Sequence, residues 1–224
     1  MHIKKIFSLF CIFCILGFSF SSYSYAITPY IWSDSNKLLE ATSSSNTTDL
    51  KLESGGAILI EQTTGQVLYE HNAHEMFRPA SVTKVMSLLL IMEALDNGQF
   101  TLSTPVPCSA HAASMGGSQI WLNEKETLTV EEMLKAICMN SANDCVVAMS
   151  EFVAGSEEEF VARMNSKARE LGMHDTTFKN PHGLDVDDHV TSAYDIALMS
   201  RELLNKHPSI TKYTSIYMDS LRDR

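Results

Sequence analysis

The segment at residues 85–95 is the feature that most limits how this chain can fold. Its sequence is VMSLLLIMEAL, in which only Ser87 and Glu93 are polar. A helix that is apolar on most of its faces is stable only when other elements cover it on several sides. Asn97 and Gly98 follow it with a helix-stop signal. The segment therefore predicts a helix buried in the middle of the molecule.

Two short strand-like runs precede this helix. Residues 57–60 (AILI) and 67–69 (VLY) flank a polar segment in which Gly65 can adopt the positive φ of a tight turn. They predict an antiparallel β-hairpin. Two strands alone make only a marginally stable sheet. We therefore expect that the leader supplies further strands, or that the chain stops before its sheet is complete.

From Thr129 onward the pattern is helical, with polar residues that can cap each helix and glycines that can end it. Together with the hairpin, these helices predict an α+β fold, in which an antiparallel sheet is flanked by helices and joined by a helical lobe. The predicted signals are a capping box at Thr129 and Glu132, a cap at Asn143 or Asp144 with a stop near Gly155, a second capping pattern at Ser156 and Glu159 with a stop at Gly172, and a start at Ser192.

The N-terminus has the pattern of an export signal. Lys4 and Lys5 precede an almost wholly apolar run at residues 6–20, and small residues follow up to Ala26. The run is shorter than the roughly twenty residues that a membrane-spanning helix needs. We therefore expect a signal peptide at 1–26, a Ser- and Thr-rich leader at 27–54, and a protein that is exported to act outside the cytoplasmic membrane.

The charge balance argues against one class of partner. The chain carries 17 basic and 27 acidic residues, a formal net charge of −10. An acidic chain without a basic cluster repels phosphate backbones, so we expect no nucleic-acid partner. Cys11 and Cys14 belong to the predicted signal peptide, and the sequence around Cys108, Cys138 and Cys145 has no C-x-x-C metal spacing, so neither a cofactor nor a metal is expected.

The start of the apolar helix carries a serine and a lysine at S-x-x-K spacing, Ser81 and Lys84. Residues three apart share one face of a helix, so the lysine amine can reach the serine hydroxyl. A serine hydroxyl is a weak nucleophile until a base removes its proton. Lysine can be that base when burial lowers its pKa. An ordinary helix start, with Ser81 as N-cap, explains the four residues equally well on their own.

A second polar turn makes the catalytic interpretation stronger. Ser141 and Asn143 lie between two predicted helices, where a sharp turn can project both side chains. S-x-x-K followed by S-x-N is the motif pair of penicillin-recognising serine enzymes. The sequence therefore predicts a four-residue site for acyl transfer.

The wider sequence resembles the D-alanyl-D-alanine carboxypeptidases among the low-molecular-mass penicillin-binding proteins, which are serine peptidases of the β-lactamase-like superfamily. The resemblance runs from about Gly55 to the end of the chain. It is carried by the hairpin and by four stretches: residues 78–86 (RPASVTKVM), 139–144 (MNSAND), 180–184 (NPHGL) and 191–195 (TSAYD).

The resemblance implies a role for each site residue. Ser81 would form an acyl-enzyme with the penultimate D-alanine of a peptidoglycan stem peptide, and Lys84 would accept its proton. Ser141 would relay a proton to the departing D-alanine, and Asn143 would hold the substrate amide while contacting Lys84. β-Lactam antibiotics would be covalent inhibitors, and the full-length protein would be able to associate with the membrane surface.

The family also carries a third motif, a Lys-Thr-Gly triplet, beyond S-x-N. Residues 144–224 contain no such triplet. We therefore expect residues 55–224 to be a partial catalytic domain, truncated before that motif and before the later sheet strands. Taken alone, this fragment would lack the substrate-carboxylate site and one oxyanion donor, so an inactive wall-binding homologue is one alternative.

Other activities remain open at this point. A class A-like β-lactamase shares the first two motifs but adds an E-x-x-L-N loop, to which residues 202–205 (ELLN) are one residue short. A D,D-endopeptidase of the same family would cut cross-links. Ser81 could instead pair with His182 and with Asp185 or Asp195 as a triad, although no G-x-S-x-G elbow is present.

Overall fold

The computed structural model describes residues 50–222 of the chain. The predicted signal peptide at 1–26 and the predicted leader as far as residue 49 lie outside these described residues. Residues from Glu53 onward belong to one folded unit, which contains all of the helices and strands given below.

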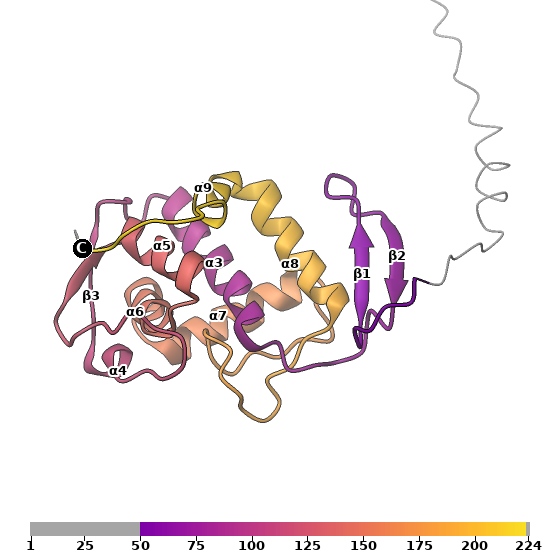
Figure 1. The fold of residues 1–224 in the computed structure, drawn as a ribbon, viewed down its shortest axis with the longest axis horizontal. Helices are drawn as coiled ribbons and strands as arrows, with labels where there is room; N and C mark the ends of the chain where they lie inside the picture. The colour runs from indigo at the N-terminus through magenta and orange to yellow at the C-terminus, as the bar shows by residue number, and fades with distance from the viewer. Residues whose placement is uncertain (1–49, 223–224) are drawn as a thin grey trace, which may run out of the picture. The chain divides into compact units, whose positions relative to one another are not determined.

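Helix α3 (Lys84–Asp96) is the centre of this unit. It packs against α6 (Asn143–Ala154), α7 (Glu157–Glu170) and α8 (Ala193–Lys206), as Figure 1 shows. Met86, Leu89, Ile91 and Met92 are completely buried. The prediction of a central helix is confirmed, because an all-apolar helix needs neighbours on several sides.

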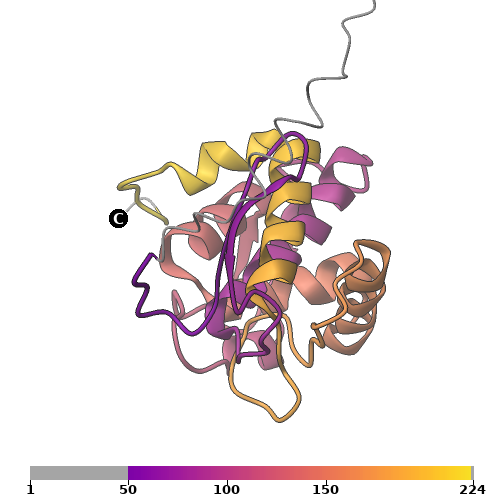
Figure 2. The ribbon, with the colours of Figure 1, turned by 90° about the vertical axis from the view of Figure 1, so that its right-hand side faces the viewer.

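A β-hairpin covers one side of α8. Strands β1 (Ala57–Ile60) and β2 (Val67–His71) pair in antiparallel fashion, and Gly65 between them has φ +77°. Strand β1 packs on α8, and both views show the hairpin beside that helix (Figures 1 and 2). The predicted hairpin is confirmed.

A second antiparallel pair, β3 (Pro105–Pro107) and β4 (Thr127–Thr129), was not predicted. Each strand has only three residues, and prolines occupy both ends of β3. Proline is generally depleted in strands and cannot donate to a ladder, so local sequence gave little indication of this sheet. Its presence fits the predicted α+β class.

The helical lobe follows the predicted order. Thr129 and Glu132 form the predicted capping box at the start of α5, Ser156 caps α7, and Ser192 caps α8. Gly155 ends α6 in the left-handed conformation. The remaining elements are η1 (Ala80–Thr83), α4 (Ala110–Ala113), α5 (Val130–Asn140), η2 (Pro208–Ile210) and α9 (Thr211–Thr214).

One predicted cap is wrong. Helix α6 has Ala142 at its N-cap position, without a side-chain capping bond, whereas Asn143 and Asp144 lie inside its first turn. The carboxylate of Asp144 instead accepts hydrogen bonds from the backbone N–H groups of Ile120 and Leu122. Asp144 also accepts a 2.9 Å hydrogen bond from the N–H of Cys145 in the same first turn, so it contacts both the neighbouring loop and the helix start. No helix within residues 50–222 is long and apolar enough to span a membrane.

Candidate active site

Ser81 and Lys84 meet where η1 becomes α3. The amine Nζ of Lys84 donates a hydrogen bond of 3.2 Å to Oγ of Ser81, which confirms the contact predicted from their spacing. Ser81 is exposed, whereas Lys84 is 4% exposed. Ser81 is not an N-cap, since it lies inside the 3₁₀ turn whose N-cap is Pro79. A hydroxyl open to solvent thus adjoins a buried amine.

Burial changes the acid–base behaviour of that amine. It lowers the pKa of Lys84 from 10.5 to about 8, because desolvation disfavours the ammonium form. Nζ of Lys84 also donates a hydrogen bond of 2.7 Å to the backbone carbonyl of His182, which stabilises the amine in its place. An amine with such a pKa can take a proton from a hydroxyl near neutral pH.

The turn at residues 180–184 supplies that carbonyl. Asn180 holds the turn from within, because its Oδ1 accepts hydrogen bonds from the N–H groups of His182 and Gly183, and its Nδ2 donates to the carbonyl of Leu184. Ser87 of α3 donates a 2.6 Å hydrogen bond to the carbonyl of Pro181. The turn is therefore fastened along the same helix that carries Lys84. Its role in holding the lysine was not predicted from the sequence.

Gly183 lets the turn approach the nucleophile closely. A Cβ atom at this position would lie 1.8 Å from the carbonyl oxygen of Ala80, the residue before Ser81, and the backbone has φ +90°. Only glycine meets both conditions without rearrangement.

We expect Gly183→Ala to be strongly destabilising. Left-handed strain and the backbone clash together cost roughly 2–5 kcal/mol, and the turn can relieve the clash only by moving away from Lys84. Gly98→Ala is the matched control, because Gly98 has φ +72° but no atom near its Cβ position. Denaturant unfolding should show a loss of about 1 kcal/mol for the control. Equal losses in the two variants would contradict the close contact.

The second motif forms the turn between α5 and α6. Ser141 adopts the left-handed conformation (φ 54°, ψ 35°) between the two helices. Within the described part of the chain, Ser141 Oγ and Asn143 Oδ1 are buried without a hydrogen-bond partner. Buried polar atoms are rarely left unpaired, so each of these two can still take a hydrogen-bond partner.

The side-chain amide of Asn143 is held by a neighbouring loop. Its Nδ2 donates a 2.8 Å hydrogen bond to the carbonyl of Gly116, and among the described residues it makes no hydrogen bond to Lys84. The amide is oriented by the loop at residues 116–122, which leaves Oδ1 as its free atom. The expected contact between Asn143 and Lys84 therefore stays a prediction.

Gly117 shows that the two halves of the site adjoin. A Cβ atom on Gly117 would lie 2.8 Å from Nδ2 of Asn143 and 3.4 Å from Cδ2 of Leu184. Leu184 belongs to the turn whose carbonyl group holds Lys84. The S-x-N turn therefore lies next to the turn at residues 180–184, and through it next to the S-x-x-K pair.

The alternative Ser-His-Asp triad is not assembled. The imidazole of His182 accepts a hydrogen bond at Nδ1 from the N–H of Leu184, and its Nε2 faces Glu157 at 3.6 Å. Asp185 pairs with Arg78, and Asp195 accepts from the N–H of Asp175 and the hydroxyl of Thr176. Neither carboxylate is hydrogen-bonded to His182, whereas the amine of Lys84 is hydrogen-bonded to Ser81.

Three histidines at near-regular spacing, His174, His182 and His189, do not converge. His189 accepts a hydrogen bond at Nδ1 from the N–H of Lys179, and its Nε2 lies 2.8 Å from the hydroxyl of Thr83. Burial lowers the pKa of His189 to about 4, so its ring is neutral and serves as a core hydrogen-bonding group. Within residues 50–222 no three metal-ligating side chains are grouped to hold an ion.

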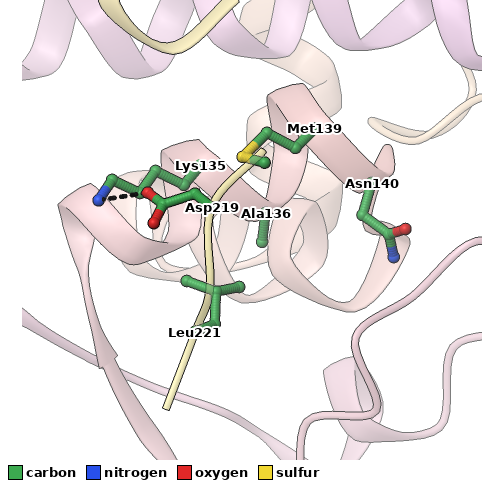
Figure 3. A pocket seen from close by; sticks show the side chains of 6 residues that line it. All are labelled: Lys135, Ala136, Met139, Asn140, Asp219 and Leu221. Atoms are coloured by element: carbon green, nitrogen blue, oxygen red, sulfur yellow. Dashed lines mark ion pairs between the residues drawn. The ribbon is translucent and has the colours of Figure 1, made fainter. Parts of the chain in front are cut away.

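A separate cavity of about 270 Å³ lies between α5 and the segment at residues 219–221 (Figure 3). Lys135 and Asp219 form a 2.9 Å ion pair on its wall, so its two charged lining groups are already matched. The cavity does not include Ser81 or Lys84. Its lining residues are Lys135, Ala136, Met139, Asn140, Asp219 and Leu221.

Comparisons with known proteins agree with this geometry. The family model described as D-alanyl-D-alanine carboxypeptidase (Peptidase_S11) matches residues 41–223. D-alanyl-D-alanine carboxypeptidase DacF of Bacillus subtilis (strain 168) is 56% identical over 177 residues, which cover 79% of this chain and 45% of DacF. The chain therefore spans less than half the length of that relative.

Solved structures show the same fold. Penicillin-binding protein 6B from Escherichia coli matches with a TM-score of 0.72 and 30% identity, over 76% of this chain and 56% of that one. Penicillin-binding protein D2 from Listeria monocytogenes, in its ampicillin-bound form, matches with a TM-score of 0.69 and 28% identity, over 78% and 71% of the two chains. The α+β, transpeptidase-like fold and the family predicted from the motifs are both confirmed. From residue 41 onward, this chain belongs to the D-alanyl-D-alanine carboxypeptidase family.

Proposed function

We propose that the whole protein is a serine-type D-Ala-D-Ala carboxypeptidase that removes the terminal D-alanine from peptidoglycan stem peptides. The observation that carries this proposal is the buried amine of Lys84, 3.2 Å from the exposed hydroxyl of Ser81. The buried, unpaired Ser141 Oγ and Asn143 Oδ1 add the polar groups that a peptide substrate needs.

In the acylation step, Ser81 Oγ attacks the carbonyl carbon of the penultimate D-alanine while Lys84 takes the hydroxyl proton. The C–N bond to the terminal D-alanine then breaks, and the proton passes through the Ser141 hydroxyl to the departing amine. Asn143 Oδ1 accepts a hydrogen bond from a substrate amide N–H. The backbone N–H of Ser81 stabilises the oxyanion.

In the second step, water attacks the ester on Ser81 with Lys84 again as base, which releases the shortened peptide and restores the serine. A β-lactam is attacked in the same way, but ring opening leaves the departing nitrogen attached. The proposal assigns no residue of this chain to the substrate carboxylate, which the family resemblance associates with a Lys-Thr-Gly triplet.

We also propose a domain organisation and a location for the protein. Residues 1–26 are a signal peptide, 27–54 a leader, and 55–224 the part of the catalytic domain that carries the first two motifs. The protein acts outside the cytoplasmic membrane, secreted or peripheral at the cell wall, with contact to the membrane surface in the full-length protein. N-terminal sequencing of the exported protein should begin at Ile27, and a start at Met1 would contradict export with cleavage.

Parallel assays on the whole protein test the activity. We expect D-alanine release from a synthetic stem peptide ending in D-Ala-D-Ala, together with stoichiometric, slowly reversed labelling by penicillin. Rapid penicillin turnover without D-alanine release would indicate a β-lactamase instead. Cleavage restricted to cross-linked dimers would indicate an endopeptidase, and an absence of both labelling and release would indicate a wall-binding homologue.

The acylation rate is expected to rise with pH. Lys84 accepts the proton only as a neutral amine, and its pKa is about 8, so about a tenth of the molecules are competent at pH 7. The penicillin acylation rate should therefore increase severalfold from pH 7 to 8 and level off near pH 9. A stopped-flow profile that falls over this range would contradict Lys84 as the base.

A further inference from the structure

Glu157, at the first position of α7, lies between two histidines. Its Oε2 is 2.6 Å from Nε2 of His111 on α4, and its Oε1 is 3.6 Å from Nε2 of His182. The Glu157 side chain is 21% exposed and that of His182 only 7%. The two imidazoles hold the pKa of Glu157 below its ordinary value, so it is a carboxylate. We call these three residues the Glu157 clasp.

The hydrogen bonding of His182 determines which of its ring nitrogens carries the proton. Nδ1 accepts a 3.1 Å hydrogen bond from the N–H of Leu184, so in the neutral ring the proton is on Nε2. The Nε2 atom lies 3.6 Å from Oε1 of Glu157. The ring therefore joins the turn at residues 180–184 to the start of α7.

The same residue holds the general base through its backbone. The carbonyl of His182 accepts the 2.7 Å hydrogen bond from Lys84 Nζ. Ser87 and Ala80 fix the turn on the side facing α3. Glu157 is a charged residue that contacts His182 of this turn from a different helix, α7.

We propose that Glu157 is a positioning residue for Lys84, which acts by clamping His182 so that its carbonyl stays within hydrogen-bond reach of the amine. This role is distinct from catalysis. Among the described residues, neither Glu157 nor His111 makes a hydrogen bond to Lys84 or to Ser81. The inference rests on the proposed function, in which Lys84 is the base.

The test compares Glu157→Ala with Glu158→Ala in the whole protein. Glu158 is the next residue on the same helix and is also acidic. It is exposed and lines the same shallow hollow at the start of α7. Glu158→Ala therefore removes the same charge from a neighbouring position. Two quantities are measured against pH: the penicillin acylation rate, and the titration of Lys84 by NMR of ¹³C-labelled lysine. The NMR titration reports Lys84 even when acylation is absent.

We expect Glu157→Ala to slow acylation at pH 7 severalfold, because the charged contact at 3.6 Å from the His182 ring is lost. Its profile and its Lys84 titration should both move to higher pH, because a loosened turn admits water to the amine. Glu157→Gln keeps an acceptor oxygen for His182 and should restore most of the wild-type profile. His111→Ala removes only the outer, exposed partner and should shift both measurements less, in the same direction.

The outcomes separate this inference from the proposed function. If the wild-type protein is not acylated, the proposed function fails, whatever the variants do. If the wild-type protein is acylated but Glu157→Ala titrates and acylates as Glu158→Ala does, the positioning role is overturned. A Glu157→Gln variant as impaired as Glu157→Ala would also overturn it. A purely structural role would lower the melting temperature without moving either pH profile.

Discussion

Replacing Ser81 by alanine is expected to abolish covalent labelling of the whole protein by a fluorescent penicillin. D-alanine release should fall by at least roughly 10³-fold, because no other group can form the acyl ester. The side chain is exposed and the substitution removes a single oxygen, so the melting temperature should change little. Lys84 keeps its hydrogen bond to the carbonyl of His182 in this variant.

Ser114→Ala is a suitable control for that experiment. Ser114 is exposed at the C-terminal end of α4, and its hydroxyl donates only to the carbonyl of His111. Its labelling should equal that of the wild-type protein. Persistent labelling of Ser81→Ala, with labelling of Ser114→Ala unchanged, would show that another residue is the nucleophile.

Loss of the lysine is expected to be almost as damaging. Lys84→Met keeps the length and the apolar stem of the side chain but removes the base, and acylation should slow by roughly 10²–10⁴-fold. Lys84→Arg should be comparably slow, although it keeps a positive donor, because a guanidinium does not lose its proton in this pH range. Acylation rates at pH 8 measure both effects.

The pair of variants distinguishes a base from a structural cation. Lys206→Met, at the exposed end of α8, is the control and should acylate normally. If Lys84→Arg retained most of the wild-type rate, the positive charge would matter and proton transfer to Lys84 would not. An enzyme with a Ser-His-Asp triad would tolerate both substitutions. That result would contradict both the geometry of the site and the proposed function.

The parts of the site that were predictable from sequence are those set by local geometry. Ser81 and Lys84 are one helical turn apart, so their contact follows from helix periodicity. The Thr129 capping box and the turn at Gly65 are likewise decided within a few residues. The central position of α3 follows from its composition, since an apolar helix must be covered.

The remainder depends on contacts between residues far apart in the chain. The carbonyl that holds Lys84 belongs to a residue 98 positions later, and a backbone carbonyl carries no sequence signal of its own. Asp144 was predicted as a possible cap because acids are common there. Besides the adjacent N–H of Cys145, its partners are backbone N–H groups more than twenty residues earlier. The Glu157 clasp similarly joins three separate segments.

Mass spectrometry of the acylated protein tests the central claim most directly. The whole protein would be exposed briefly to penicillin, denatured in acid and digested, and the modified peptide fragmented to locate the adduct. We predict one intact penicillin per molecule, attached through an ester to Ser81. An adduct on any other residue, or no adduct in a protein that still releases D-alanine from the stem peptide, would contradict the account.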